Sequence, residues 1–136
     1  MKKILLALFV MLAMVSCRKD ETHVANGNDT LIGSWINPQY TDTLVVYSRA
    51  VNLIENEIGF TFQARDKFIY RQNSGWCGTP PITTADYDGT WTRNDSIINI
   101  TVGYWGGTAE YTWKIIKLDD QELVIAVVKL SFSQGK

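Results

Sequence analysis

The sequence predicts an all-β fold, either an eight-stranded antiparallel up-and-down barrel or a strongly bent half-barrel. From residue 31 onward, short segments rich in β-branched and aromatic residues alternate with turn residues. Within each segment apolar and polar side chains alternate, which gives every strand one apolar face and one solvated face. Most links between the segments are short, and short links favour pairing between consecutive strands.

The first expected strand covers residues 31–36 and ends at Asn37-Pro38, because proline has no amide N–H for the ladder. The second covers 43–48, and residues 50–54 either extend it or form a short helix. The same alternation of apolar and polar residues predicts six further strands. They cover residues 58–63, 67–72, 86–93, 96–102, 108–118 and 122–128.

The alternation also places nine aromatic rings on the inward faces of these strands. Each buried ring removes about 150–250 Å² from water. An eight-stranded barrel is either filled by its own side chains or just wide enough for one small ligand, and the sequence leaves both alternatives open. The inward rings are Trp35, Phe60, Phe62, Phe68, Tyr70, Tyr87, Trp91, Tyr111 and Trp113.

In an up-and-down barrel, successive links alternate between the two ends. The tight turns at 64–66, 94–95 and 119–120 are therefore expected at one end, and the longer links at 49–57, 73–85 and 103–107 at the other. Long loops on a rigid scaffold often carry function, so the long-link end is the predicted recognition surface. The alternative is that these loops fold down and plug the barrel. This end gathers Trp76, Cys77, Pro80, Pro81, Tyr104 and Trp105.

The N-terminus indicates export from the cytoplasm. A basic start at Lys2 and Lys3 precedes an apolar run over residues 4–15. This run is too short to span a bilayer, which needs roughly 20 apolar residues. It is typical of a cleaved signal peptide, here residues 1–16. The letters "MVSC" that end at Cys17 resemble the lipobox of bacterial lipoproteins.

The lipobox resemblance implies that Cys17 carries acyl chains such as palmitate, anchors the protein in a membrane and is the first residue of the mature protein. Residues 17–30 then form a flexible tether, and residues 31–136 form the barrel domain. The letters "KDE" at 19–21 resemble the signal that sends some lipoproteins of Gram-negative bacteria to the outer leaflet. A solvated linker explains these three residues equally well. The expected location is the outer membrane, with exposure at the cell surface if that signal operates.

The composition argues against several classes of function. A formal net charge of −1 does not supply the basic face that nucleic-acid binding requires. The single histidine, His23, lies in the tether, so Cys77 has no histidine in the domain to act as its base. The carboxylates lie at turns or on solvated faces and form no catalytic or metal-binding pattern. We therefore expect no enzyme activity, no metal and no cofactor.

Three segments resemble a known family. They read "IGSWI", "DGTWTRNDSIINITV" and "YTWKIIKLDDQELVI", and together they look like the lipocalin-like domain of many small bacterial lipoproteins. The Gly33-Ser34-Trp35 step resembles the Gly-x-Trp signature on the first strand of lipocalins. The resemblance implies a lipocalin-like barrel that binds a small molecule.

Two hypotheses for function follow. The first is a membrane-anchored module that binds a small apolar or amphipathic ligand. In it, Trp35, Tyr111 and Trp113 line the interior. Trp76 and Trp105 lie at the mouth of the barrel. The second is a filled barrel whose aromatic loops contact an envelope protein or a glycan.

Overall fold

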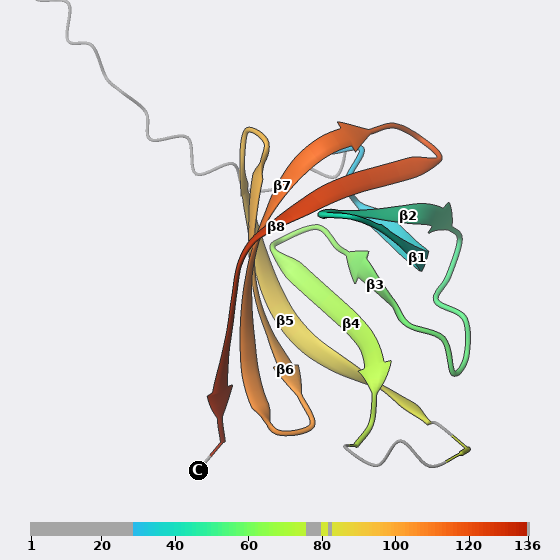
Figure 1. The fold of residues 1–136 in the computed structure, drawn as a ribbon, viewed down its shortest axis with the longest axis vertical. Coiled ribbons are helices and arrows are strands. Elements are labelled where there is room, and N and C mark those ends of the chain that lie inside the picture. Colours follow the sequence, from blue (N-terminus) through green and yellow to red (C-terminus); the bar gives the residue numbers. More distant parts are fainter. Residues whose placement is uncertain (1–28, 76–79, 82, 136) are drawn as a thin grey trace, which may run out of the picture.

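The computed structural model describes residues 29–75, 80–81 and 83–135. They form a closed barrel of eight antiparallel strands (Figure 1), which confirms the predicted fold class. Within this part of the chain, no helix is long and apolar enough to cross a membrane. The strands are β1 (Gly33–Thr41), β2 (Leu44–Ala50), β3 (Gly59–Phe62), β4 (Lys67–Asn73), β5 (Thr84–Asn94), β6 (Ile97–Tyr104), β7 (Gly107–Leu118) and β8 (Glu122–Gln134).

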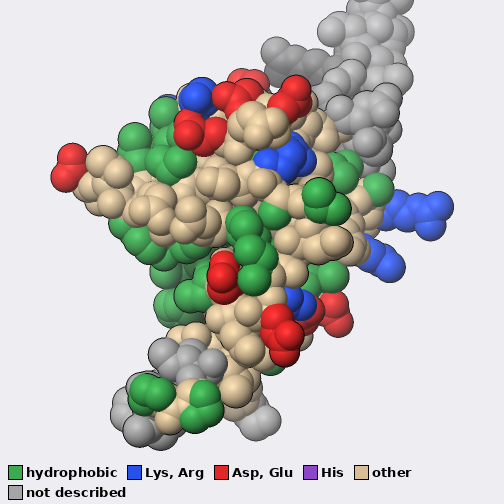
Figure 2. Space-filling view, turned by 90° about the vertical axis from the view of Figure 1, so that its right-hand side faces the viewer, with side chains coloured by type: hydrophobic (Ala, Val, Ile, Leu, Met, Phe, Trp, Pro, Cys, Tyr) green, Lys and Arg blue, Asp and Glu red, His purple; other side chains and the backbone are tan. Residues whose placement is uncertain are grey.

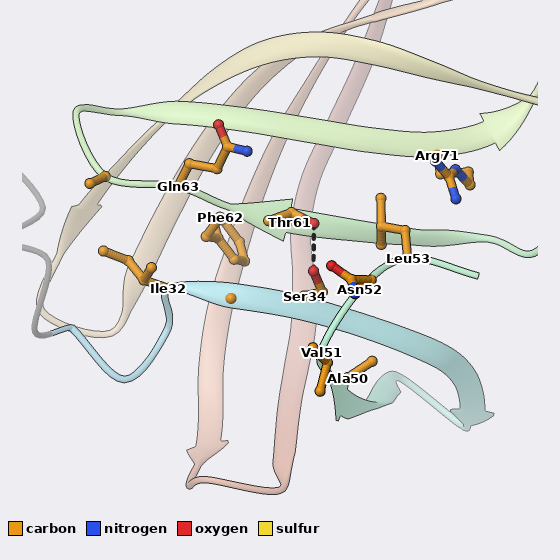
Figure 3. A pocket seen from close by; sticks show the side chains of 12 residues that line it. Ile32, Ser34, Ala50, Val51, Asn52, Leu53, Thr61, Phe62, Gln63 and Arg71 are labelled. Carbon is orange, nitrogen blue, oxygen red and sulfur yellow. Dashed lines mark hydrogen bonds between the residues drawn. The ribbon is translucent and has the colours of Figure 1, made fainter. Parts of the chain in front are cut away.

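The order of the strands around the barrel departs from a strict up-and-down arrangement at one place. Strands β3 to β8 follow one another, but β1 lies between β2 and β3, and β2 pairs with β8. Ser34 of β1 faces Ala50 of β2 on one side and Thr61 of β3 on the other. Because both pairings are antiparallel, β2 and β3 run in the same direction. The link at residues 51–58 must therefore cross β1, as Figure 3 shows for its first residues.

Strand β1 continues past Asn37-Pro38 to Thr41, so the expected end at this dipeptide is wrong. The strand accommodates this dipeptide in a β-bulge. Its register with β2 shifts between Ile36 and Gln39, and Asn37 has a φ of 56°. Pairing of β1 with β3 ends at Ile36, so the strand has a single partner where proline lacks its N–H. Proline is tolerated in a sheet at such bulges and edges.

Two of the links also differ from the prediction. Residues 51–58 contain neither strand nor helix, so β2 ends at Ala50. The link between β6 and β7 is a two-residue turn, Trp105-Gly106, and not a longer loop. The following Gly107 has a φ of 151°, and a β-carbon there would meet the backbone oxygen of Ser133. A side chain is therefore disfavoured at this turn.

The links gather at two ends of the barrel, as the sequence predicts for the tight turns. We call one end the turn end; it contains the links at 63–66, 95–96 and 119–121, together with residues 29–32. Backbone hydrogen bonds join these links to neighbouring strands, for example Trp91 N to Asp66 O at 3.0 Å and Ile115 N to Ser96 O at 2.7 Å. We call the other end the loop end; it contains the links at 42–43, 74–83 and 105–106 and the end of β8.

Aromatic rings fill the barrel on the turn-end side, and they lie on the inward faces that the alternation predicts. The ring of Phe60 is central: its centroid lies 4.6 Å from that of Tyr47, 5.3 Å from Phe62, 5.6 Å from Phe68 and 5.2 Å from Trp113. Tilted and edge-to-face contacts at these distances are favourable for aromatic pairs. The side chains that are exposed by less than 2 % and anchor this core include Trp35, Trp91, Phe60, Phe62, Phe68, Ile98, Leu123 and Ile125.

Candidate functional site at the loop end of the barrel

The turn end is sealed around Trp35, which is fully buried. Its indole Nε1 donates to the carbonyl oxygen of Leu31 at 2.9 Å. The guanidinium carbon of Arg49 lies 4.1 Å from the Trp35 ring centroid, which places a cation over the aromatic face. Arg49 also donates to the carbonyl oxygens of Ile32, at 2.9 Å, and Thr30. Trp35 therefore belongs to the closure of this end, and we do not include it in the candidate site.

Asp29 adds an ion pair to the same closure. Its Oδ1 lies 2.6 Å from Nη1 of Arg93 and accepts the backbone N–H of Leu31 at 2.9 Å. Both charged side chains are largely covered, with 20 % and 28 % of their surface exposed. Residues 29 and 30, which the sequence analysis assigned to the tether, therefore belong to the folded barrel.

Several tyrosines lie on the inward faces nearer the loop end, and we call four of them the tyrosine cluster: Tyr40, Tyr47, Tyr70 and Tyr111. Tyr70 and Tyr111 are half-buried, and their ring centroids are 6.1 Å apart. Tyr47 lies deeper, with 4 % of its surface exposed, whereas Tyr40 is 75 % exposed. The cluster therefore runs from solvent at the loop end down to the filled core.

The hydroxyls of Tyr47, Tyr70 and Tyr111 stay protonated at neutral pH, because the pKa of each is raised. Burial raises the pKa of Tyr47 and Tyr70 far above the usual value, and neighbouring tyrosines raise it further. Burial also raises the pKa of Tyr111. A protonated phenol both donates and accepts a hydrogen bond. The cluster therefore offers a ligand neutral polar groups inside an apolar surface.

Trp113 lies beneath the cluster and carries a donor without a partner. Its side chain is 2 % exposed, and its ring centroid lies 5.5 Å from Tyr111 and 6.4 Å from Tyr47. In the described part of the chain, nothing accepts its indole Nε1–H. The other two fully buried indoles do have acceptors: Trp35 donates to Leu31 O at 2.9 Å, and Trp91 donates to Gln63 O at 3.0 Å.

Charged side chains are nearly absent from the interior. On the described strands, Arg49 and Arg93 are the charged residues that pair with fully buried members of the core, Trp35 and Ile98 respectively. Both lie at the turn end. Other charges lie on the outer face; Arg71 there makes a bidentate pair with Asp86 at 2.6 and 2.8 Å. The half of the interior nearer the loop end is therefore apolar and uncharged among the residues that can be described.

The rim of the loop end exposes apolar side chains. Strand β8 pairs with β2 only as far as Ala126, so its last residues have β7 alone as a neighbour among the described strands. Leu130 and Phe132 face Tyr111 and Ala109 of β7 and are 45 % and 58 % exposed. We call Tyr104, Trp105 and Phe132 the aromatic rim; Tyr104 lies 5.8 Å from Trp105 and 5.3 Å from Phe132 between ring centroids.

A separate groove of about 550 Å³ lies on the outer wall, beneath the link that crosses β1 (Figure 3). Ser34 Oγ and Thr61 Oγ1, which line it, share a hydrogen bond of 2.8 Å. Val51 at its edge is 93 % exposed. Lys and Arg side chains are scattered over the face shown in Figure 2 and form no continuous basic patch there. None of the residues that line the groove carries a buried polar side-chain atom without a hydrogen-bond partner.

The structure brings together some of the predicted site residues. Tyr111 and Trp113 are neighbours in the interior, and Trp105 lies at the rim with 52 % of its surface exposed. Trp76 and the lipidation residue Cys17 lie outside the described residues. Tyr47 was missed as a site residue, although it alternates with Val45 on the second strand and its inward face could have been read from that pattern.

The described residues offer no candidate metal-binding site. Residues 29–75, 80–81 and 83–135 contain no group of three or more His, Cys, Asp or Glu side chains close enough together to hold a metal ion. The polar groups of the candidate site are phenols and an indole, which bind through hydrogen bonds.

Comparison with models of protein families gives a match over most of the barrel. Residues 31–125 match the family model described as a lipocalin-like domain. No curated protein and no solved structure matches the chain.

Proposed function

Because the chain belongs to the lipocalin-like domain family, we propose that it binds a small apolar or amphipathic molecule at the loop end of its barrel. A lipocalin-like barrel is a small-molecule-binding fold, and an eight-stranded barrel is wide enough for one small ligand. The observation that supports this proposal most directly is the difference between the two ends of the barrel. The turn end is sealed by Arg49 and Trp35, whereas the loop end presents the half-buried rings of Tyr70 and Tyr111.

The exposed apolar side chains of β8 explain why the proposed ligand is apolar over most of its length. Leu130, Phe132 and Val127 are large apolar side chains left between 45 % and 58 % exposed. Covering such surface is favourable by about 0.8 kcal/mol for each buried methylene of a ligand. The hydroxyls of the tyrosine cluster add a few polar contacts that orient the molecule, as small-molecule sites generally do.

The same proposal includes anchoring through lipid on Cys17 in the outer membrane, on the support of the lipobox-like sequence. The described residues begin with Asp29 at the turn end, so an anchor on Cys17 would join the barrel at the end opposite to the proposed site. The role proposed is that of a binding module, neither an enzyme nor a nucleic-acid-binding protein; the net charge of −1 supports the second exclusion. Cys17→Ala should abolish acyl labelling and release the protein from membranes, and retention of both would contradict the anchor.

Mass spectrometry tests the ligand directly. The protein is purified from its own host, the folded chain is extracted, and small molecules in the extract are identified. A stoichiometric compound is expected, and the variant Tyr70→Ala/Tyr111→Ala should retain less of it than Asp86→Ala, which alters only the outer wall. An empty extract, together with no binding of added single-chain amphiphiles by folded protein, would contradict the proposal.

A second function is favoured by the rim itself. Trp105 and Phe132 are more than half exposed, and the free edge of β8 can accept another strand. A filled barrel that contacts an envelope protein or a glycan through this rim would use these residues. Cross-linking from position 105 to one partner in intact cells, lost in Phe132→Ser but kept in Trp113→Phe, would support this function over the first.

A further inference from the structure

We infer that the end of the ligand that enters the barrel is uncharged and carries a hydrogen-bond acceptor, as an ester, amide, ketone or alcohol does. The inference rests on the proposed function and names the class of ligand for the same site. It is carried by the unpartnered indole N–H of Trp113 and by the charge-free interior around it.

The indole of Trp113 requires an acceptor. It is a donor only, and it is buried at 2 % exposure without a partner among the described residues. Buried polar groups in folded proteins are nearly always hydrogen-bonded, so each exception needs an explanation, and Trp113 Nε1 is one of two among the described residues. Trp35 and Trp91 show that this barrel supplies carbonyl acceptors to its other buried indoles. A ligand oxygen that reaches Trp113 would give this third buried indole its acceptor.

The neighbours of Trp113 set the charge of that oxygen. The rings of Tyr47, Phe60 and Tyr111 lie around the indole of Trp113, with their centroids 5.2–6.4 Å from its own. None of them is ionised at neutral pH. A buried carboxylate without a cationic partner carries a large desolvation penalty. A neutral oxygen makes the same hydrogen bonds without that penalty.

The two interior arginines do not supply the missing cation. Arg93 is paired with Asp29, and Arg49 donates to two backbone carbonyls over the Trp35 ring. The Nε of Arg49 is also buried without a partner, but it lies at the turn end, on the far side of the filled core. A cationic head group fits no better, because an ammonium has no lone pair for the indole N–H, although rings can attract it.

The test compares four probes with one alkyl chain: 1-dodecanol, methyl dodecanoate, dodecanoate and dodecyltrimethylammonium. Binding to the purified full chain carrying Cys17→Ala is measured by titration calorimetry at pH 8, below the micelle concentration of the two charged probes and below the solubility limit of the two neutral probes. The two neutral probes are expected to bind at least 10-fold more tightly than either charged probe. Trp113→Phe, which keeps a ring and removes the N–H, is expected to weaken the binding of methyl dodecanoate 3- to 10-fold.

Trp91→Phe is the matched control, because it removes an indole N–H that already has the Gln63 acceptor at the turn end. This variant should leave the ratio between the affinities for the neutral and the charged probes unchanged. Equal or tighter binding of dodecanoate or of dodecyltrimethylammonium would overturn the inference and leave the binding function intact. An unchanged affinity of folded Trp113→Phe for methyl dodecanoate would also overturn it. If folded protein binds none of the four probes, the proposed function itself fails.

Discussion

The two ends of the barrel use the same residue types in different ways. At the turn end, the indole of Trp35, the guanidinium of Arg49 and the carboxylate of Asp29 all bond to other groups of the chain. Toward the loop end, the indole of Trp113 beneath the tyrosine cluster has no acceptor among the described residues, and Phe132 at the rim remains 58 % exposed. The chain itself bonds nearly all of these groups at the turn end, with Arg49 Nε as the exception, whereas the half toward the loop end leaves polar and apolar groups that a ligand or partner can satisfy.

The difference has an energetic consequence. A buried polar group without a partner costs about 1–3 kcal/mol, and an exposed apolar ring forgoes the stabilisation that burial would bring. Such costs are concentrated at sites that act on other molecules, because a structure selected only for stability would remove them. We therefore expect substitutions at the turn end to change stability and substitutions at the loop end to change binding.

The largest effect is expected for Trp35→Ala. It removes a fully buried ring, the Leu31 hydrogen bond and the surface on which Arg49 rests, so the free energy of unfolding should fall by about 3–5 kcal/mol. Trp105→Ala, at the loop end with 52 % exposure, should cost less than about 1 kcal/mol. Urea denaturation measures both, and equal losses would break the contrast between the two ends.

Alkaline pH is expected to weaken the fold through the tyrosine cluster. The folded-state pKa values of Tyr47 and Tyr70 are raised by burial above the unfolded value, which is about 10. Their stabilising contribution is complete below pH 10 and declines as pH rises further, by up to about 1.4 kcal/mol per pH unit for each group. Denaturation at pH 9, 10 and 11 measures the decline, and Tyr47→Phe should reduce its slope. Ionisation of every tyrosine near pH 10 in folded protein would contradict this.

A matched pair of variants isolates the hydrogen bond of a buried indole. Trp91→Phe loses ring area and leaves the Gln63 carbonyl without its donor, whereas Trp113→Phe loses similar area and no hydrogen bond. Trp91→Phe should therefore cost about 1–2 kcal/mol more free energy of unfolding than Trp113→Phe. Thermal and urea denaturation give the difference. A larger cost for Trp113→Phe would mean that its N–H has a partner in solution.

The smallest effect is expected on the outer wall. The hydrogen bonds from Arg71 hold the pKa of Asp86 below its usual value. The pair is therefore stabilising above about pH 4, and this contribution declines as pH falls through the lowered pKa. Because the carboxylate side chain is 45 % exposed, Asp86→Asn should cost no more than about 1 kcal/mol at pH 7. A cost that persists unchanged at pH 2 would exclude the charge as its cause.

The sequence predicted the strands well and their neighbours less well. Alternation at Phe60 and Phe62, and again at Tyr111 and Trp113, identified both the strands and the faces that are buried. Alternation is a property of one strand, so it does not say which strand lies beside it. The insertion of β1 between β2 and β3 and the bulge at Asn37 depend on contacts between strands. Neither could be derived from residue patterns alone.

By itself, the sequence determined the all-β class, most of the inward aromatic set and the lack of histidine in the domain, because side-chain alternation and composition act locally. Only the tertiary structure decided what each ring does. Trp35 and Trp113 occupy inward positions of the same kind, but Trp35 lies near the carbonyl of Leu31 and Trp113 has no acceptor among the described residues. That difference arises from which backbone atoms the closed barrel brings beside each indole.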